Sequence, residues 1–147
     1  MTDLAVARVL HVLGVVLWIG GVAMVTTVVL PQGIAVFERA ERAFGRQARI
    51  ATLVVGASGF YLVHRLGLWG RFYEPGFWWM HAMVAIWLAF TLVLFVLEPL
   101  FLHRWFQRHA AADPAGTVRL LIALHWLLLV LSLATIGAAA AGSHGLL

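Results

Sequence analysis

Histidine is the residue in this chain best able to do chemistry, because three histidines lie inside long apolar runs. His11 stands in an uncharged run over residues 9–31, and His81 and His125 occupy comparable positions in later runs. An ionisable side chain in such a run is costly unless it is hydrogen-bonded or binds a metal. We therefore treat these histidines as candidate cofactor ligands.

The composition is that of an integral membrane protein. Of the 147 residues, 63% are hydrophobic and 11% are charged, whereas charged residues make up about a quarter of a typical soluble domain. Cysteine is absent, which excludes disulfides, iron–sulfur clusters and thiolate metal sites. The net charge of +4 comes from arginines between the apolar runs. They indicate contacts with lipid headgroups, and we expect no nucleic-acid partner.

The hydropathy pattern predicts an all-α, integral membrane, up-down four-helix bundle that forms one domain over residues 1–147. The expected spans are 4–30, 50–66, 77–97 and 120–141. The first span is too long for a signal-peptide core and is expected to be retained as a transmembrane helix. The polar residues 31–49 are expected to form a short amphipathic segment along the membrane surface.

A weak internal repeat divides the chain into two halves. Histidine, proline, glycine and histidine follow one another in the same order in each half, as His11, Pro31, Gly56 and His64 and then as His81, Pro99, Gly137 and His144. The pattern predicts two helical hairpins related by an axis along the membrane normal.

The arginine distribution predicts the orientation. Seven arginines lie in the connections around 31–49 and 99–119, and three lie on the other side. By the positive-inside rule, both termini are expected on the periplasmic side of a bacterial inner membrane.

The depth of each histidine indicates which of them can share a cofactor. At ~1.5 Å of rise per residue, His11, His64 and His81 lie about 9–10 Å from the middle of their spans toward the outer face. His125 lies about 6 Å from the middle toward the inner face. Histidines of facing helices at one depth can ligate the iron of haem b. Because the first and third helices of such a bundle are diagonal partners, we expect His11 and His81 to form the axial pair.

Other residues are expected around that pair. His64 is an alternative ligand, and Arg65 beside it is a partner for a haem propionate. Gly14, one turn after His11, either leaves room for the porphyrin or serves helix packing. His125 is expected either to pack with a hydrogen bond or to belong to a second site toward the inner face. Three further histidines are expected to be solvated or to pack only: His103, His109 and His144.

Three parts of the chain follow a pattern known from other membrane proteins, namely Leu10-His11 through Trp18 with Gly20-Gly21, Arg42 to Arg49, and Trp79-Met80-His81-Ala82. In these parts the chain resembles the copper-resistance protein D (CopD-like) group of small membrane proteins and the related HemJ-type protoporphyrinogen oxidases. The resemblance implies a four-helix membrane bundle, with haem b in the HemJ branch and copper handling in the CopD branch. HemJ-type proteins follow the His-Ala of their third helix with lysine. Met83 stands in that place here, which disfavours porphyrinogen oxidation.

Three functions remain open from the sequence. The first is a membrane b-type cytochrome, an oxidoreductase that takes electrons from a quinol or protein donor, as a homo-oligomer or as a small subunit of a larger respiratory complex. The alternative is a copper-binding or copper-transfer protein that uses His11, His64 and His81 with Met80 or Met83, since imidazole and thioether both suit copper. The third is a structural subunit whose histidines only pack.

Overall fold

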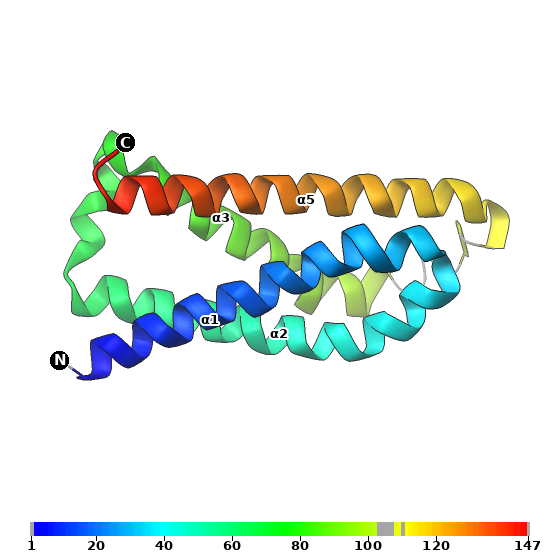
Figure 1. Ribbon diagram of the computed structural model, residues 1–147, viewed down its shortest axis with the longest axis horizontal. Helices are drawn as coiled ribbons and strands as arrows, with labels where there is room; N and C mark the ends of the chain where they lie inside the picture. The colour runs from blue at the N-terminus through cyan, green and yellow to red at the C-terminus, as the bar shows by residue number, and fades with distance from the viewer. Residues whose placement is uncertain (1, 103–107, 110, 147) are drawn as a thin grey trace.

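The computed structural model describes residues 2–102, 108–109 and 111–146. This part of the chain is 94% helical and contains no strand. Its long helices are α1 (Thr2–Met24), α2 (Ile34–Arg65), α3 (Trp78–Leu92) and α5 (Pro114–Ser143). They run along one common long axis, and both termini lie at the same end (Figure 1). The all-α bundle expected from the sequence is therefore confirmed. We call the end that carries both termini the termini end, and the opposite one the far end.

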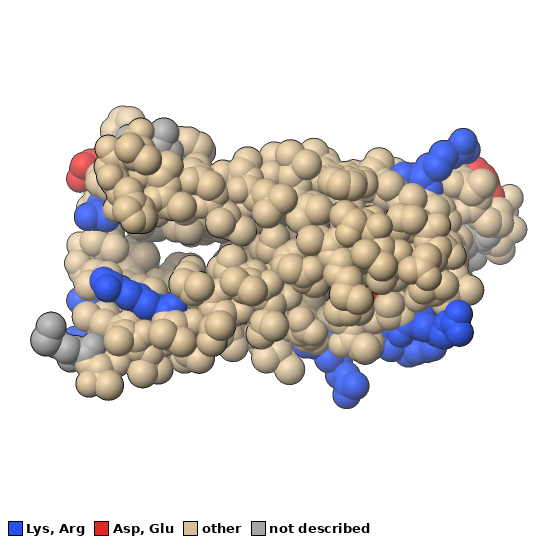
Figure 2. Space-filling view, in the orientation of Figure 1, with Lys and Arg blue, Asp and Glu red and all other residues tan. Residues whose placement is uncertain are grey.

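Three stretches of the described chain are long and apolar enough to cross a membrane, namely Thr2–Gln32, Pro75–Leu100 and Pro114–Ser143. In Figure 2 the arginines gather toward the two ends of the molecule, with an uncharged band between them. The protein is therefore a helical membrane protein. Helix α2 is not among the three stretches, because its first half is rich in charged residues and only its second half is apolar.

Residues 34–49 differ from the sequence prediction. They were expected to lie along the membrane surface, but they form the first half of α2, which runs without a break from Ile34 to Arg65. The reversal between α1 and α2 falls at Gly33, whose φ of 99° is a conformation that favours glycine. The chain therefore needs only one residue to turn before the second helix begins.

Both helices that run toward the far end widen into a π-helix there. Helix α1 continues into the π segment Val25–Val29, just before Pro31, and α3 continues into Val93–Leu102, which contains Pro99. Proline lacks a backbone N–H, and its ring crowds the preceding turn, so an ordinary α-helix is difficult to maintain at these points. The two π segments occupy equivalent places in the two halves, as a repeated hairpin would require.

The four helices pack as two hairpins. Helix α1 lies mainly against α2, and α3 lies mainly against α5. The core between the hairpins consists of Trp18, Ile19, Ala51, Val55, Phe90 and Leu129. In its centre the rings of Trp18 and Phe90 meet edge to face, with 4.9 Å between centroids. This aromatic pair joins the first hairpin to the second.

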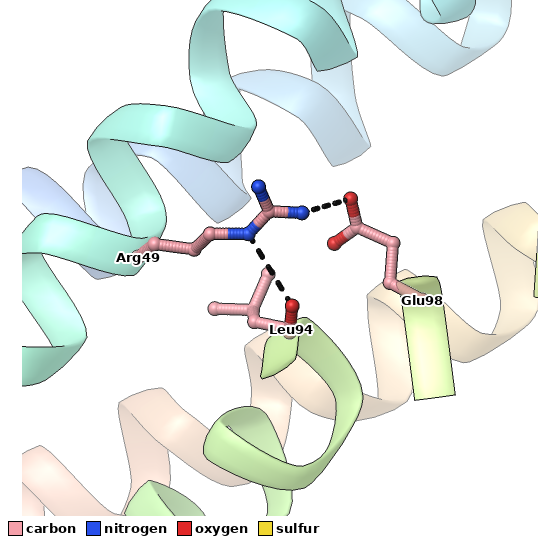
Figure 3. A network of polar contacts seen from close by, with 3 residues as sticks. All are labelled: Arg49, Leu94 and Glu98. Atoms are coloured by element: carbon pink, nitrogen blue, oxygen red, sulfur yellow. Dashed lines mark hydrogen bonds and ion pairs between the residues drawn. The ribbon is translucent and has the colours of Figure 1, made fainter. Parts of the chain in front are cut away.

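Two polar contacts also join α2 to α3 and its π segment. The indole of Trp87 donates to the carbonyl oxygen of Thr52 at 2.9 Å. Toward the far end, the guanidinium of Arg49 lies 2.6 Å from the carboxylate of Glu98 and donates to the carbonyl oxygen of Leu94 at 3.3 Å (Figure 3). The hydrogen bond from Arg49 to Leu94 satisfies a backbone carbonyl inside the π segment.

Candidate functional site

A cavity of about 570 Å³ lies between the two hairpins toward the termini end. The molecular surface is visibly hollowed there (Figure 2). Its size falls in the range of ligand cavities, about 300–1,000 Å³. All four helices contribute to its wall, which is almost entirely apolar, and His11 is part of that wall. We call it the His11 cavity.

The imidazole of His11 is fixed by α2. Its Nδ1 atom lies 3.1 Å from the carbonyl oxygen of Val55 and 3.1 Å from the hydroxyl of Ser58. A carbonyl oxygen can only accept, so this network assigns the proton to Nδ1 and leaves a lone pair on Nε2. No described residue hydrogen-bonds to Nε2. In a metal-ligating histidine, Nδ1–H commonly donates to a backbone carbonyl while the lone pair of Nε2 binds the metal.

Gly59 provides the space in which this imidazole lies. A Cβ atom at Gly59 would be 3.1 Å from Cε1 of His11, closer than most real side-chain contacts. Val55, Ser58 and Gly59 follow one another at i, i+3 and i+4, so they present one face of α2 to the histidine. Sequence reasoning missed this trio, although its spacing is the signal that could have identified it.

Helix α3 presents methionine to the cavity instead of histidine. Met80, Met83, Val84 and Trp87 line the His11 cavity at i, i+3, i+4 and i+7. His81 is rotated about 100° from Met80, because an α-helix has 3.6 residues per turn. The side chain of His81 is exposed, and its ring meets Phe72 edge to face at 5.2 Å. The structure therefore does not bring His81 and His11 together.

Two buried indole groups near the cavity have no hydrogen-bond partner among the described residues, namely the N–H groups of Trp18 and Trp79. Both residues line the His11 cavity, but their indole nitrogens are fully buried, and that of Trp79 lies against Gly142 of α5. Arg8 is also part of the wall and is a charged donor that suits a ligand with acceptor groups such as carboxylates.

Of the two roles expected for Gly14, the structure supports helix packing. A Cβ atom there would lie 2.8 Å from Cγ2 of Val55, so Gly14 lets α1 approach α2 closely and leaves no room for a porphyrin. The expectation of a cofactor role for Gly14 is therefore not supported by this structure.

His64 and Arg65 lie at the termini end of α2, outside the wall of the His11 cavity. The side chain of His64 is exposed. The guanidinium of Arg65 lies 2.9 Å from the carboxylate of Asp3, to which the hydroxyl of Tyr61 also donates at 2.8 Å. Arg65 thus joins the start of α1 to the end of α2.

His125 belongs to a second cavity, of about 460 Å³, nearer the far end. Its Nδ1 atom lies 2.9 Å from the carbonyl oxygen of Leu121, and Phe37 meets its ring edge to face at 5.9 Å. We call this the His125 cavity. Of the remaining histidines, His109 and His144 are exposed, and His103 lies outside the described residues.

The described residues contain no group of three or more histidine, aspartate and glutamate side chains that could hold a metal ion. A metal at His11 would need ligands of another kind. Those available in the His11 cavity are the thioethers of Met80 and Met83 or the nitrogens of a macrocycle.

No protein-family model, no curated protein and no solved structure matches this chain. The fold and composition define its class, which is an all-helical integral membrane protein.

Proposed function

We propose that this chain is a membrane b-type cytochrome that holds haem b in the His11 cavity, with His11 as an axial ligand. One observation carries the proposal. The Nδ1 atom of His11 is bound to the carbonyl oxygen of Val55, so Nε2 is the nitrogen left for a ligand in a large apolar cavity. An imidazole oriented in this way is prepared to coordinate iron.

The other groups in the cavity fit the same cofactor. Met80 and Met83 offer thioether sulfur from α3, the helix that would supply the second axial ligand. Arg8 is a charged donor in the same wall that would suit the propionates. When bound, haem supplies one-electron oxidation and reduction, and the protein tunes its potential through the axial ligands and the polarity of the cavity.

This proposal replaces the bis-histidine pair expected from the sequence by one histidine and one methionine. The reason is the exposure of His81 and the position of both methionines in the cavity wall. Methionine ligation raises the reduction potential relative to two histidines.

The cellular setting is also part of the proposal. We place the protein in a bacterial inner membrane with both termini on the periplasmic side, because seven of the ten arginines fall within residues 31–49 and 99–119 of the sequence. The His11 cavity then opens nearer the periplasm. Electrons would pass to or from a quinol or a protein partner of a larger membrane complex.

A visible spectrum of the purified full-length protein tests the haem proposal. After reduction with dithionite we expect a sharp α band and a sharp Soret band at about one haem per chain. Protein expressed with adequate haem supply that shows neither band would contradict the proposal.

Copper binding is the second candidate function, and the two methionines favour it. Met80 and Met83 lie with His11 in the wall of one cavity, and thioether with imidazole is a donor set that suits copper. Haem-free protein that retains about one copper per chain after dialysis, and loses it in Met80→Leu and Met83→Leu, would establish this alternative.

A further inference from the structure

The His125 cavity has a different character from the His11 cavity. It lies between α1, the first half of α2, the end of α3 with the π segment that follows it, and α5. Its wall includes the polar side chains Glu41, Gln47, Glu98 and His125 among aromatic and aliphatic ones. The function proposed above uses none of these residues.

Most of the polar atoms that this wall offers to a ligand are hydrogen-bond acceptors. The Nδ1–H of His125 donates to the carbonyl oxygen of Leu121, which leaves the lone pair of Nε2. The amide nitrogen of Gln47 donates one of its two hydrogens to the carbonyl oxygen of Leu17 at 3.2 Å, which leaves the amide oxygen and one N–H. A ligand that satisfies these acceptors must bring donors of its own.

The charges of the wall favour a neutral donor over a cation. The carboxylate of Glu98 is already paired with Arg49 at 2.6 Å (Figure 3). Glu41 also has an interaction within the chain. A bound cation would have to compete with these existing contacts, whereas a hydroxyl group would not.

The remaining wall suits a flat ring. Trp18, Phe37, Phe44 and Phe90 line the cavity, and aromatic faces and edges are favourable partners for another aromatic ring. Phe37 also packs edge-on against His125, with an interplanar angle of 86°, and so fixes the imidazole. A lipid-soluble ligand fits this position, because the wall residues outside α2 belong to the three stretches that are long and apolar enough to cross a membrane.

A neutral, lipid-soluble aromatic ring with hydroxyl donors is a hydroquinone. We infer that the His125 cavity binds the head of a membrane quinol, with one hydroxyl donating to Nε2 of His125. Trp18 lines both cavities, so one indole would separate the bound ring from the His11 cavity. The binding itself does not depend on the haem proposed above.

The first test varies the ligand and leaves the protein unchanged. The full-length protein in lipid nanodiscs is titrated calorimetrically, without oxygen, with decyl-ubiquinol and with its dimethyl ether, which has the same ring and tail but no hydroxyl donor. We expect the ether to bind about tenfold more weakly, the effect of one lost hydrogen bond to a buried acceptor. Equal affinities, or no quinol binding, would overturn the inference.

The second test compares His125 of α5 with His144, the residue that directly follows this helix. His125→Ala should weaken decyl-ubiquinol binding about tenfold. His144→Ala is the matched control, because His144 has the same Nδ1 contact to the carbonyl four residues earlier, at 2.8 Å, but is exposed outside both cavities. It should change the affinity less than about twofold.

Haem content is measured in the same samples, which separates the two proposals. Protein without haem bands that still binds decyl-ubiquinol in this pattern supports the quinol site and contradicts only the haem proposal. Loss of haem in His125→Ala with unchanged quinol affinity would overturn the quinol site.

Discussion

At the scale of single residues, the central feature is the way α2 holds His11. The carbonyl of Val55 and the hydroxyl of Ser58 are both 3.1 Å from Nδ1, while Gly59 leaves the space that the ring occupies. These hydrogen bonds offset the free-energy cost of burying an imidazole among membrane helices. They also decide which ring nitrogen is left for a ligand.

Gly59→Ala tests this arrangement. The added Cβ would lie 3.1 Å from Cε1 of His11, so the ring must shift by a few tenths of an ångström. We expect a lower haem-to-protein ratio, measured from the reduced spectrum and total protein, because axial ligation depends on the orientation of the imidazole.

The control is Gly20→Ala, since a Cβ at Gly20 meets nothing within 4 Å. This variant should keep its haem and gain about 0.5–1 kcal/mol of stability, the ordinary benefit of alanine over glycine inside a helix. Equal haem content in the two variants would show that Gly59 does not shape the site.

At the scale of helices, close contact between α1 and α2 sets the position of His11 over its partners. Gly14 lies one turn from His11 and directly against Val55, the residue whose carbonyl binds Nδ1. The packing of the hairpin and the geometry of the imidazole are therefore coupled through the same pair of helices.

Gly14→Leu should consequently destabilise the hairpin. Even its Cβ would stand 2.8 Å from Cγ2 of Val55, and the rest of the side chain would force the helices apart. Overpacking of this kind typically costs about 1–3 kcal/mol. We expect a lower midpoint of thermal unfolding in detergent than for Gly20→Leu, and an unchanged midpoint would contradict the packing role of Gly14.

Helix α3 explains why the fold could be predicted and its cavity-facing residues could not. Apolar runs and arginine-rich connections are enough to predict membrane helices. The run around His81 is apolar on every side, so no polar face marks its orientation. Packing against the other helices decides which side of α3 faces the cavity, and that side carries Met80 and Met83. His11 was singled out because it stands in an uncharged run, but its contacts to Val55 and Ser58 depend on how α1 packs against α2 and were not predicted.

At the scale of the whole molecule, both termini lie at one end (Figure 1). The residues that line the two cavities lie toward opposite ends of the helices. Trp18 is a part of both walls and meets Phe90 of the second hairpin. The side chains at the centre of the bundle therefore both hold the hairpins together and separate the two sites.

The orientation of the molecule is tested by a fusion at the C-terminus. Seven arginines lie within residues 31–49 and 99–119, and three lie in the rest of the chain. By the positive-inside rule, this distribution predicts that the C-terminus is periplasmic. Alkaline phosphatase, which is active only after export, should therefore give signal, whereas green fluorescent protein exported through the same route should give none. The reverse result would place the His11 cavity nearer the cytoplasm.

The most direct test of the haem proposal is the reduced visible spectrum of two matched variants, His11→Ala and His81→Ala. Both histidines are expected at the same depth, and only His11 belongs to the cavity wall. The account predicts that His11→Ala loses the α and Soret bands of low-spin haem, whereas His81→Ala keeps them at nearly the intensity of the unmodified protein. Retained bands in His11→Ala would contradict it, and their loss in His81→Ala would return the second ligand to His81.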